Sequence, residues 1–133
     1  MDISQIEKEL MEVSEGLLML SETDAPFEFY YHEKPEDEFD EDIVVEWDGK
    51  PGGTSVQVLT VDEFFKRMKN PHKDADDTQK KNAARFKELE AKLNELLDDV
   101  KAYKLSDVTL PVYIIGRTKN GDYAGLKTLV VET

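Results

Sequence analysis

The residues of this chain that could do chemistry are two histidines and a cluster of aspartates. His32 and His72 are the side chains best suited to general acid–base catalysis near neutral pH. Asp74, Asp76 and Asp77 follow His72 in the stretch PHKDADDTQ, and their oxygens suggest a cation site. The chain has no cysteine, which excludes disulfides, thiolate metal sites and thiol nucleophiles.

Neither group matches a catalytic or metal-binding pattern. A calcium loop needs Gly at its sixth position and Glu at its twelfth; counted from Asp74, those positions hold Gln79 and Arg85. Glu22 and Asp24 are two acids beside a proline turn, and no third group is implied. The phosphate-binding loop, the nucleophile elbow and the HExxH zinc motif do not occur. We therefore expect no metal or cofactor and no catalysis, with a small histidine-dependent enzyme as the weakest alternative.

The net charge of the chain narrows the class of partner. There are 30 acidic and 17 basic residues, a formal net charge of −13. Such a chain repels nucleic-acid phosphates and anionic lipid, so we expect it to bind neither nucleic acid nor membrane. It attracts basic proteins, among which nucleic-acid enzymes are the obvious kind, although solubility alone also explains an acidic composition.

Length and composition indicate one globular domain over residues 1–133. Hydrophobic residues make up 39% of the chain, which is enough for a core at this length. No apolar run is long enough to cross a bilayer, and the opening MDISQIEKEL lacks a signal-peptide pattern. These observations predict a cytoplasmic protein.

The first element expected is an amphipathic helix that ends near Gly16. Its start has two possible caps, a capping box of Ser4 and Glu7 or the side chain of Asp2. The apolar stripe, at three- and four-residue steps, consists of Ile3, Ile6, Leu10, Val13 and Leu17.

A second, longer helix is predicted from about Gln79 to Lys101, and a short one over Val61–Met68. Asp76, Asp77 and Thr78 offer caps to the long helix. Its apolar stripe consists of Ala83, Phe86, Leu89, Leu93, Leu97 and Val100. The stripe is too short for a coiled coil, so we expect this helix to pack on the rest of the domain.

Strands are expected between and after these helices. The expected strand ranges are Phe27–Glu33, Ser55–Val61, a short piece near Leu105–Val108, and two strands that flank Asn120-Gly121. An Asn-Gly pair between apolar strands is a strong hairpin signal. The stretch Phe39–Trp47 stays open, because its four-residue apolar steps suit a helix and its β-branched residues suit a strand. Together the elements predict an α+β domain with helices packed on a sheet.

Three stretches, in the same order, resemble the nuclease A inhibitor family of bacteria. They are GLLMLSETDAPFE at Gly16–Glu28, VDEFFKRMKNP at Val61–Pro71 and LPVYIIGRTKNGDYAGLKTLVVET at Leu110–Thr133. The resemblance implies a three-layer α/β/α sandwich of the PR-1-like kind, with a mixed, largely antiparallel sheet. It also implies inhibition of a non-specific, magnesium-dependent DNA/RNA nuclease, with no catalysis by the inhibitor itself.

The resemblance further implies which residues contact the nuclease. By match, Thr133 inserts into the nuclease active site and approaches its metal with Glu132 beside it, while Glu22 pairs with a basic residue. An oxygen-rich chain end suits magnesium, a hard cation that prefers oxygen ligands. An inhibitor of this kind can act as a monomer.

One position departs from the family pattern. Where family members carry a Trp after the short helix, this sequence aligns Asp74. Aromatic anchors often dominate an interface, so this loss weakens the case for tight binding to the same nuclease. Asp74, Asp76 and Asp77 would then contribute by charge. The departure keeps an alternative open, an acidic binding module for another basic protein.

Overall fold

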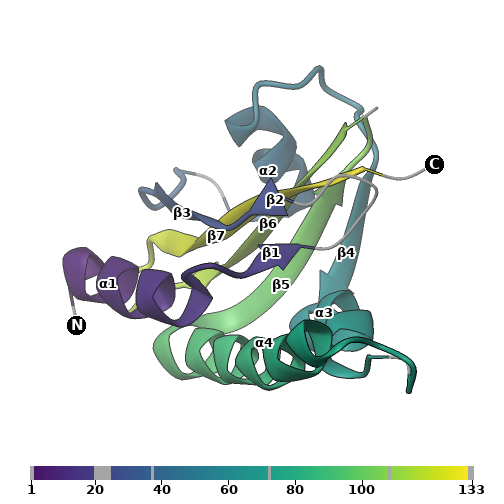
Figure 1. Ribbon diagram of the computed structural model, residues 1–133. Helices are drawn as coiled ribbons and strands as arrows, with labels where there is room; N and C mark the ends of the chain where they lie inside the picture. The colour runs from purple at the N-terminus through teal and green to yellow at the C-terminus, as the bar shows by residue number, and fades with distance from the viewer. Residues whose placement is uncertain (1, 20–24, 37, 72, 108, 132–133) are drawn as a thin grey trace.

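The chain has a mixed α+β fold in which four described helices are interspersed with seven described strands (Figure 1). The computed structural model describes residues 2–19, 25–36, 38–71, 73–107 and 109–131. The helices are α1 (Ile3–Ser14), α2 (Glu41–Trp47), α3 (Val61–Lys69) and α4 (Asp77–Leu96). The strands are β1 (Leu18–Met19), β2 (Ala25–Pro26), β3 (Glu28–His32), β4 (Val56–Thr60), β5 (Asp98–Leu105), β6 (Thr109–Arg117) and β7 (Tyr123–Val131).

The main sheet has five strands in the order β3-β7-β6-β5-β4, and β1 pairs with β2 in a separate two-stranded sheet. All described strand pairs are antiparallel. The expectation of a largely antiparallel sheet is therefore confirmed, while its mixed character is wrong for the described residues. β7 lies between β3 and β6, with Glu28 opposite Lys127 and Tyr113 opposite the same lysine on the other side. The last described strand is therefore an interior strand.

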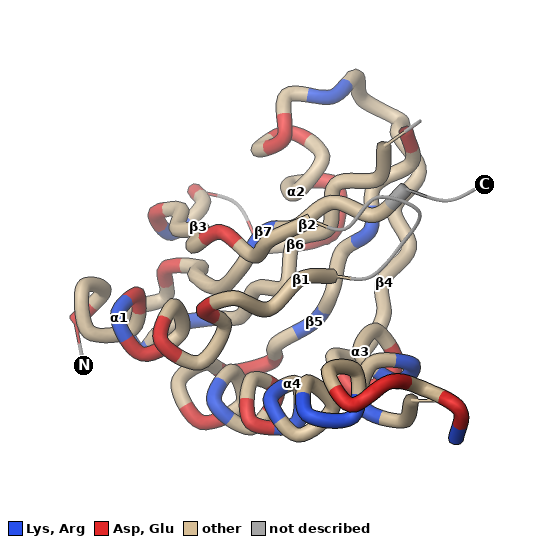
Figure 2. Tube along the Cα trace, in the orientation of Figure 1, with Lys and Arg blue, Asp and Glu red and all other residues tan. Residues whose placement is uncertain are grey.

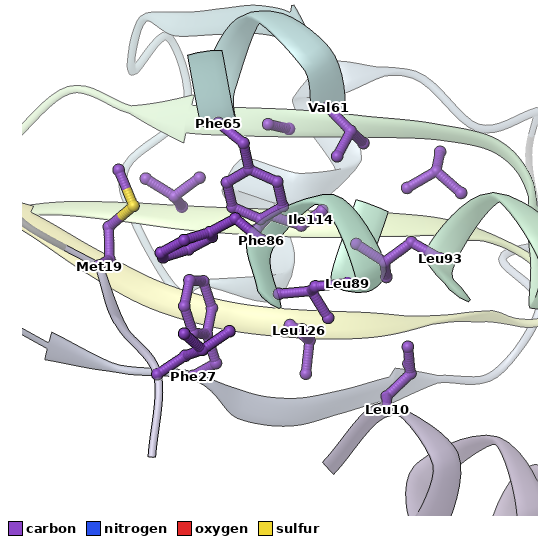
Figure 3. Close-up of a cluster of buried hydrophobic side chains, with 14 of the residues drawn as sticks. Leu10, Met19, Phe27, Val61, Phe65, Phe86, Leu89, Leu93, Ile114 and Leu126 are labelled. Atoms are coloured by element: carbon purple, nitrogen blue, oxygen red, sulfur yellow. The ribbon is translucent and has the colours of Figure 1, made fainter. Parts of the chain in front are cut away.

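Each face of the sheet carries its own hydrophobic core. One face packs against α1, α3 and α4 through aliphatic and Phe side chains, among them Leu10, Phe65, Phe86 and Leu126 (Figure 3). The opposite face packs against α2, where Val44 and Val45 meet a set of tyrosines. Helices thus cover both faces, and the two cores differ in chemistry.

Short polar side chains cap the N-termini of the helices. Asp2 caps α1 by accepting a hydrogen bond from the Gln5 amide at 2.9 Å, so of the two expected caps Asp2 is the one used. Asp40 accepts from the amides of Asp42 and Ile43, and this cap settles the open stretch as the helix α2. Thr60 and Glu63 form the capping box of α3.

The long helix ends earlier than the apolar stripe predicted. α4 stops at Leu96, and Leu97 is already extended. Leu97 and Val100 are buried in the same core as the helix, so the stripe correctly predicts burial but not the backbone. β5 therefore occupies Asp98–Leu105, and the short strand expected near Leu105–Val108 is wrong in its placement, with Val108 outside the described residues.

The hairpin predicted at Asn120-Gly121 is confirmed. The Thr118 amide donates to the Asp122 carbonyl at 2.8 Å, and the Gly121 amide donates to the Thr118 carbonyl at 3.0 Å. Gly121 has a φ of 88°, which a residue with a Cβ rarely adopts. This turn sets the register of β6 and β7.

Candidate functional site

β1 and β2, which flank the segment of Glu22, lie beside β7, the strand that leads to Thr133. Because Glu28 of β3 lies opposite Lys127, residues before Glu28 run alongside residues after Lys127. The Thr128 hydroxyl donates a hydrogen bond to the Pro26 carbonyl oxygen at 3.0 Å, which ties β2 to β7. Figure 1 shows β1 and β2 beside the end of β7 that leads to the label C. Glu22, Glu132 and Thr133 themselves lie outside the described residues.

The base of the β1–β2 hairpin is anchored by buried side chains. Leu17, Met19 and Phe27 belong to the core shared with α3 and α4. The Phe27 ring meets the rings of Phe65 and Phe86 edge to face, with centroids 6.0 and 6.1 Å apart (Figure 3). Such aromatic contacts add to the burial energy. The hairpin therefore starts from a rigid base, fixed to both helices.

Arg85 of α4 fixes the turn between α1 and β1. Its guanidinium donates to the carbonyl oxygens of Val13 and Glu15, which are free acceptors at the end of the helix. Gly16 follows with a φ of 75°, and a Cβ there would lie 3.8 Å from the Arg85 guanidinium. Arg85 thus stabilises the helix end and sets the direction in which the chain enters β1.

Two of the aspartates near the start of α4, Asp76 and Asp77, stabilise the N-terminus of this helix. Asp76 caps α4 by accepting from the Gln79 amide at 2.8 Å, as the sequence indicated. Asp77 is the first residue of the helix, where a negative charge is favourable. All three carboxylates, including that of Asp74, are exposed. Among the described residues, no three His, Asp or Glu side chains gather closely enough to hold a metal ion.

His32 packs against an aromatic side chain of α2. His32 stacks on Trp47 with ring centroids 4.0 Å apart, and its Nδ1 lies 2.8 Å from the Glu33 carbonyl oxygen. This contact packs the end of β3 against α2. His72 lies outside the described residues.

Charged residues are distributed over several elements of the fold. In Figure 2, acidic residues follow α1, the region of β3 and α2, and the segment that leads into α4, while basic residues alternate with acids along α4. No helix in the described ranges combines the length and the apolar character needed to cross a bilayer.

Two structural residues of the site gave no signal in the sequence. Thr128, buried in β7, has the β-branched side chain typical of a strand, and its bond to Pro26 depends on a pairing across about a hundred residues. Arg85 is one of several charged residues on α4. Only the folded geometry shows that each of them supports the β1–β2 hairpin.

Comparison of the sequence with known protein families assigns the chain to a family. Residues 4–133 match the family of nuclease A inhibitor-like proteins. The chain belongs to this family. The match covers nearly the whole chain and confirms the resemblance inferred from the three sequence stretches. A comparison with curated protein sequences finds no match.

Membership in the nuclease A inhibitor-like family connects the β1–β2 hairpin and the end of β7 with a possible contact to a nuclease. The family description points to a protein that acts on a nuclease. The structure adds that β1 and β2 are anchored by core side chains on either side of residues 20–24. A hydrogen bond also ties β2 to β7, the strand that precedes residue 132. We refer to β1, β2 and β7 together as the frame, because they hold the chain on both sides of residue 22 and before residue 132.

Proposed function

We propose that this protein inhibits a non-specific, magnesium-dependent DNA/RNA nuclease by blocking its active site. The family match over residues 4–133 carries the proposal. The net charge of −13 supports it, because a site that binds phosphates presents basic side chains and a metal, and both attract an acidic protein.

In this proposal Thr133 and Glu132 approach the nuclease metal while Glu22 pairs with a Lys or Arg of the nuclease. Magnesium takes oxygen ligands, and a carboxylate forms strong charge-assisted hydrogen bonds with Arg. The Thr128–Pro26 hydrogen bond supports joint action of the two segments, because it ties together the strands that lead to them. A frame ordered before binding lowers the entropic cost of association.

Asp74, Asp76 and Asp77 add negative charge to the proposed contact surface. Their exposure supports this role, although Asp76 also caps α4. Asp74 replaces the aromatic residue implied by the resemblance, so we expect the loop to speed association more than it slows dissociation.

We also infer that the domain is a three-layer α/β/α sandwich of the PR-1-like kind. The two cores support this, since α1, α3 and α4 pack on one face of the sheet and α2 on the other. The protein acts as a monomer, does no catalysis and needs no cofactor, since the metal belongs to the nuclease.

The test is titration into a magnesium-dependent non-specific nuclease from the same organism. In a protein that ends at Thr133, one added glycine should weaken inhibition by about tenfold or more, since it moves the carboxylate by one residue. A glycine inserted between Gly52 and Gly53, in the turn before β4, is the control and should change nothing. Unchanged inhibition by the extended protein would contradict the proposed role of the chain end.

A second candidate function is an acidic binding module for a different basic protein. The observation that favours it is Asp74, an exposed carboxylate where the resemblance implies an aromatic anchor. Affinity capture from a lysate of the source separates the two functions. Recovery of a nuclease supports the inhibitor, and recovery only of another basic protein supports the alternative.

A further inference from the structure

An apolar groove of about 570 Å³ lies between the C-terminal half of α1 and the base of the β1–β2 hairpin. Leu17 and Phe27 are 1% and 4% exposed and belong to the core beneath it. Leu18 is one of the most exposed large hydrophobic residues, at 39%. The apolar lining residues are Met11, Leu17, Leu18, Pro26 and Phe27. The groove therefore joins a rigid base to exposed apolar side chains.

The polar groups of the groove lie at its rim. Ser14 is buried, and its hydroxyl is satisfied by the Leu10 carbonyl oxygen at 2.8 Å. Glu12, Glu15, Lys8 and Gly16 are exposed and complete the lining. Within the described part of the chain, neither glutamate forms an ion pair. The groove thus offers an apolar floor with two carboxylates and one ammonium group at its rim, which leaves the rim with a net negative charge.

We propose that this groove receives a segment of the target nuclease in which an apolar side chain is flanked by Lys or Arg. The inference rests on the proposed function and extends it to a second contact. The apolar floor requires an apolar occupant, because a polar group there would lose its hydration without a hydrogen-bond partner. The net negative charge of the rim, two glutamates against one lysine, favours basic neighbours on that occupant.

The position of the groove supports this choice of partner. Its floor residues Leu18 and Pro26 are the paired residues of β1 and β2, the strands that lead to the segment of Glu22. We therefore expect a nuclease that contacts Glu22 to reach the groove as well. An apolar anchor in the groove replaces the aromatic anchor that the loop of Asp74 lacks.

The absence of cysteine allows a direct test of whether the groove is covered. Leu18→Cys, labelled with an environment-sensitive fluorophore, should shift its emission to shorter wavelength when the nuclease is added. The matched control is Val58→Cys on β4, because Val58 is 44% exposed and lies at the opposite edge of the main sheet. Emission from the Leu18 label that stays unchanged at saturating nuclease would overturn the proposal.

A charge-reversal pair tests the basic character of the occupant. Glu12→Lys/Glu15→Lys should weaken inhibition by at least about tenfold relative to Glu38→Lys/Glu46→Lys, which changes the net charge equally near α2. Lys near the end of α1 is compatible with the helix dipole, so the fold should be retained, as circular dichroism can check. Equal inhibition by the two double variants would overturn the groove contact.

The outcomes separate the two proposals. A wild-type protein that inhibits, together with variants that behave alike, refutes only the groove contact. A wild-type protein that fails to inhibit refutes the proposed function and, with it, the occupant assigned to the groove.

Discussion

At the scale of single residues, Asp48 shows how this domain keeps a charge in a nearly buried place. Its side chain is 7% exposed and accepts a hydrogen bond from the Tyr113 hydroxyl. Lys50 and Lys127 lie 3.4 and 3.6 Å from its carboxylate oxygens. A buried carboxylate is tolerated only with such partners. Asp48 therefore joins the end of α2 to the sheet through β6 and β7.

The tyrosines of the α2 face predict loss of stability at alkaline pH. Burial raises the pKa of Tyr30 and of Tyr103 to about 12, from the ordinary value of 10.0. Because the unfolded chain loses these protons first, the stabilising contribution is complete below pH 10 and declines as pH rises toward about 12. Denaturant titrations across this range should show the decline. Full tyrosinate absorbance near pH 10 in a folded protein would contradict it.

Asp76 allows the structural and the proposed interface roles to be separated. Asp76→Ala removes the cap of α4 and should lower the free energy of unfolding by about 1 kcal/mol. Asp76→Asn keeps a capping oxygen but loses the charge, so stability should stay close to that of the wild type while association with the nuclease slows. Chemical denaturation and stopped-flow binding measure the two effects. If Asp76→Asn binds at the wild-type rate, the charge of Asp76 plays no part in association.

At the scale of elements, the start of β5 packs closely against β6. The β5–β6 pairing is irregular between Asp98 and Lys101, and Asp99 has a φ of 51°. A Cβ at Gly116 would lie 2.7 Å from the Asp98 carbonyl oxygen and 2.7 Å from a methyl group of Val100. The absence of a side chain at Gly116 allows the bulged strand to approach.

Gly116→Ala should therefore destabilise the protein by about 1–3 kcal/mol, because a backbone atom of β5 has to move. Gly52→Ala is the matched control, since a Cβ there meets nothing within 4 Å. Denaturation midpoints of the two variants measure the difference. Equal midpoints would show that β5 moves at little cost.

Sequence patterns predicted most elements but not where α4 gives way to β5. The apolar stripe from Ala83 to Val100 indicates which residues are buried. Residues of α4 and of β5 are buried in the same core, so the stripe does not distinguish the helix from the strand. A three- and four-residue period therefore continues past the true end of the helix at Leu96. Asp98 and Asp99, which favour helices weakly, were the available sign of the break.

The candidate site was predictable only in part, for a related reason. Family resemblance pointed to Glu22 and Thr133, and local capping rules gave Asp76 its role in α4. The residues that hold the frame, Arg85 and Thr128, act across long separations in sequence. Local periodicity carries no information on such contacts, so the structure was needed to find them.

At the scale of the whole molecule, the net charge of −13 should govern how fast a basic partner is found. Attraction between exposed charges is screened by salt, with a Debye length of about 10 Å at 0.1 M. We expect the association rate constant with the nuclease to fall by about tenfold or more from low to physiological salt. Stopped-flow binding across a salt series measures it. A rate constant independent of salt would mean that contacts other than charge limit association.

The strand order also has a consequence for the time course of synthesis. β3 pairs with β7, yet about ninety residues separate them along the chain, and within the described sheet β7 alone connects β3 to the other strands. While the ribosome makes the first three quarters of the protein, β3 has no neighbour in the sheet and the apolar side of α1 has no completed surface to cover. α1 and β3 therefore cannot reach their final packing before β7 has been synthesised. We expect the domain to complete its folding in one late step, after β7 has emerged from the ribosome.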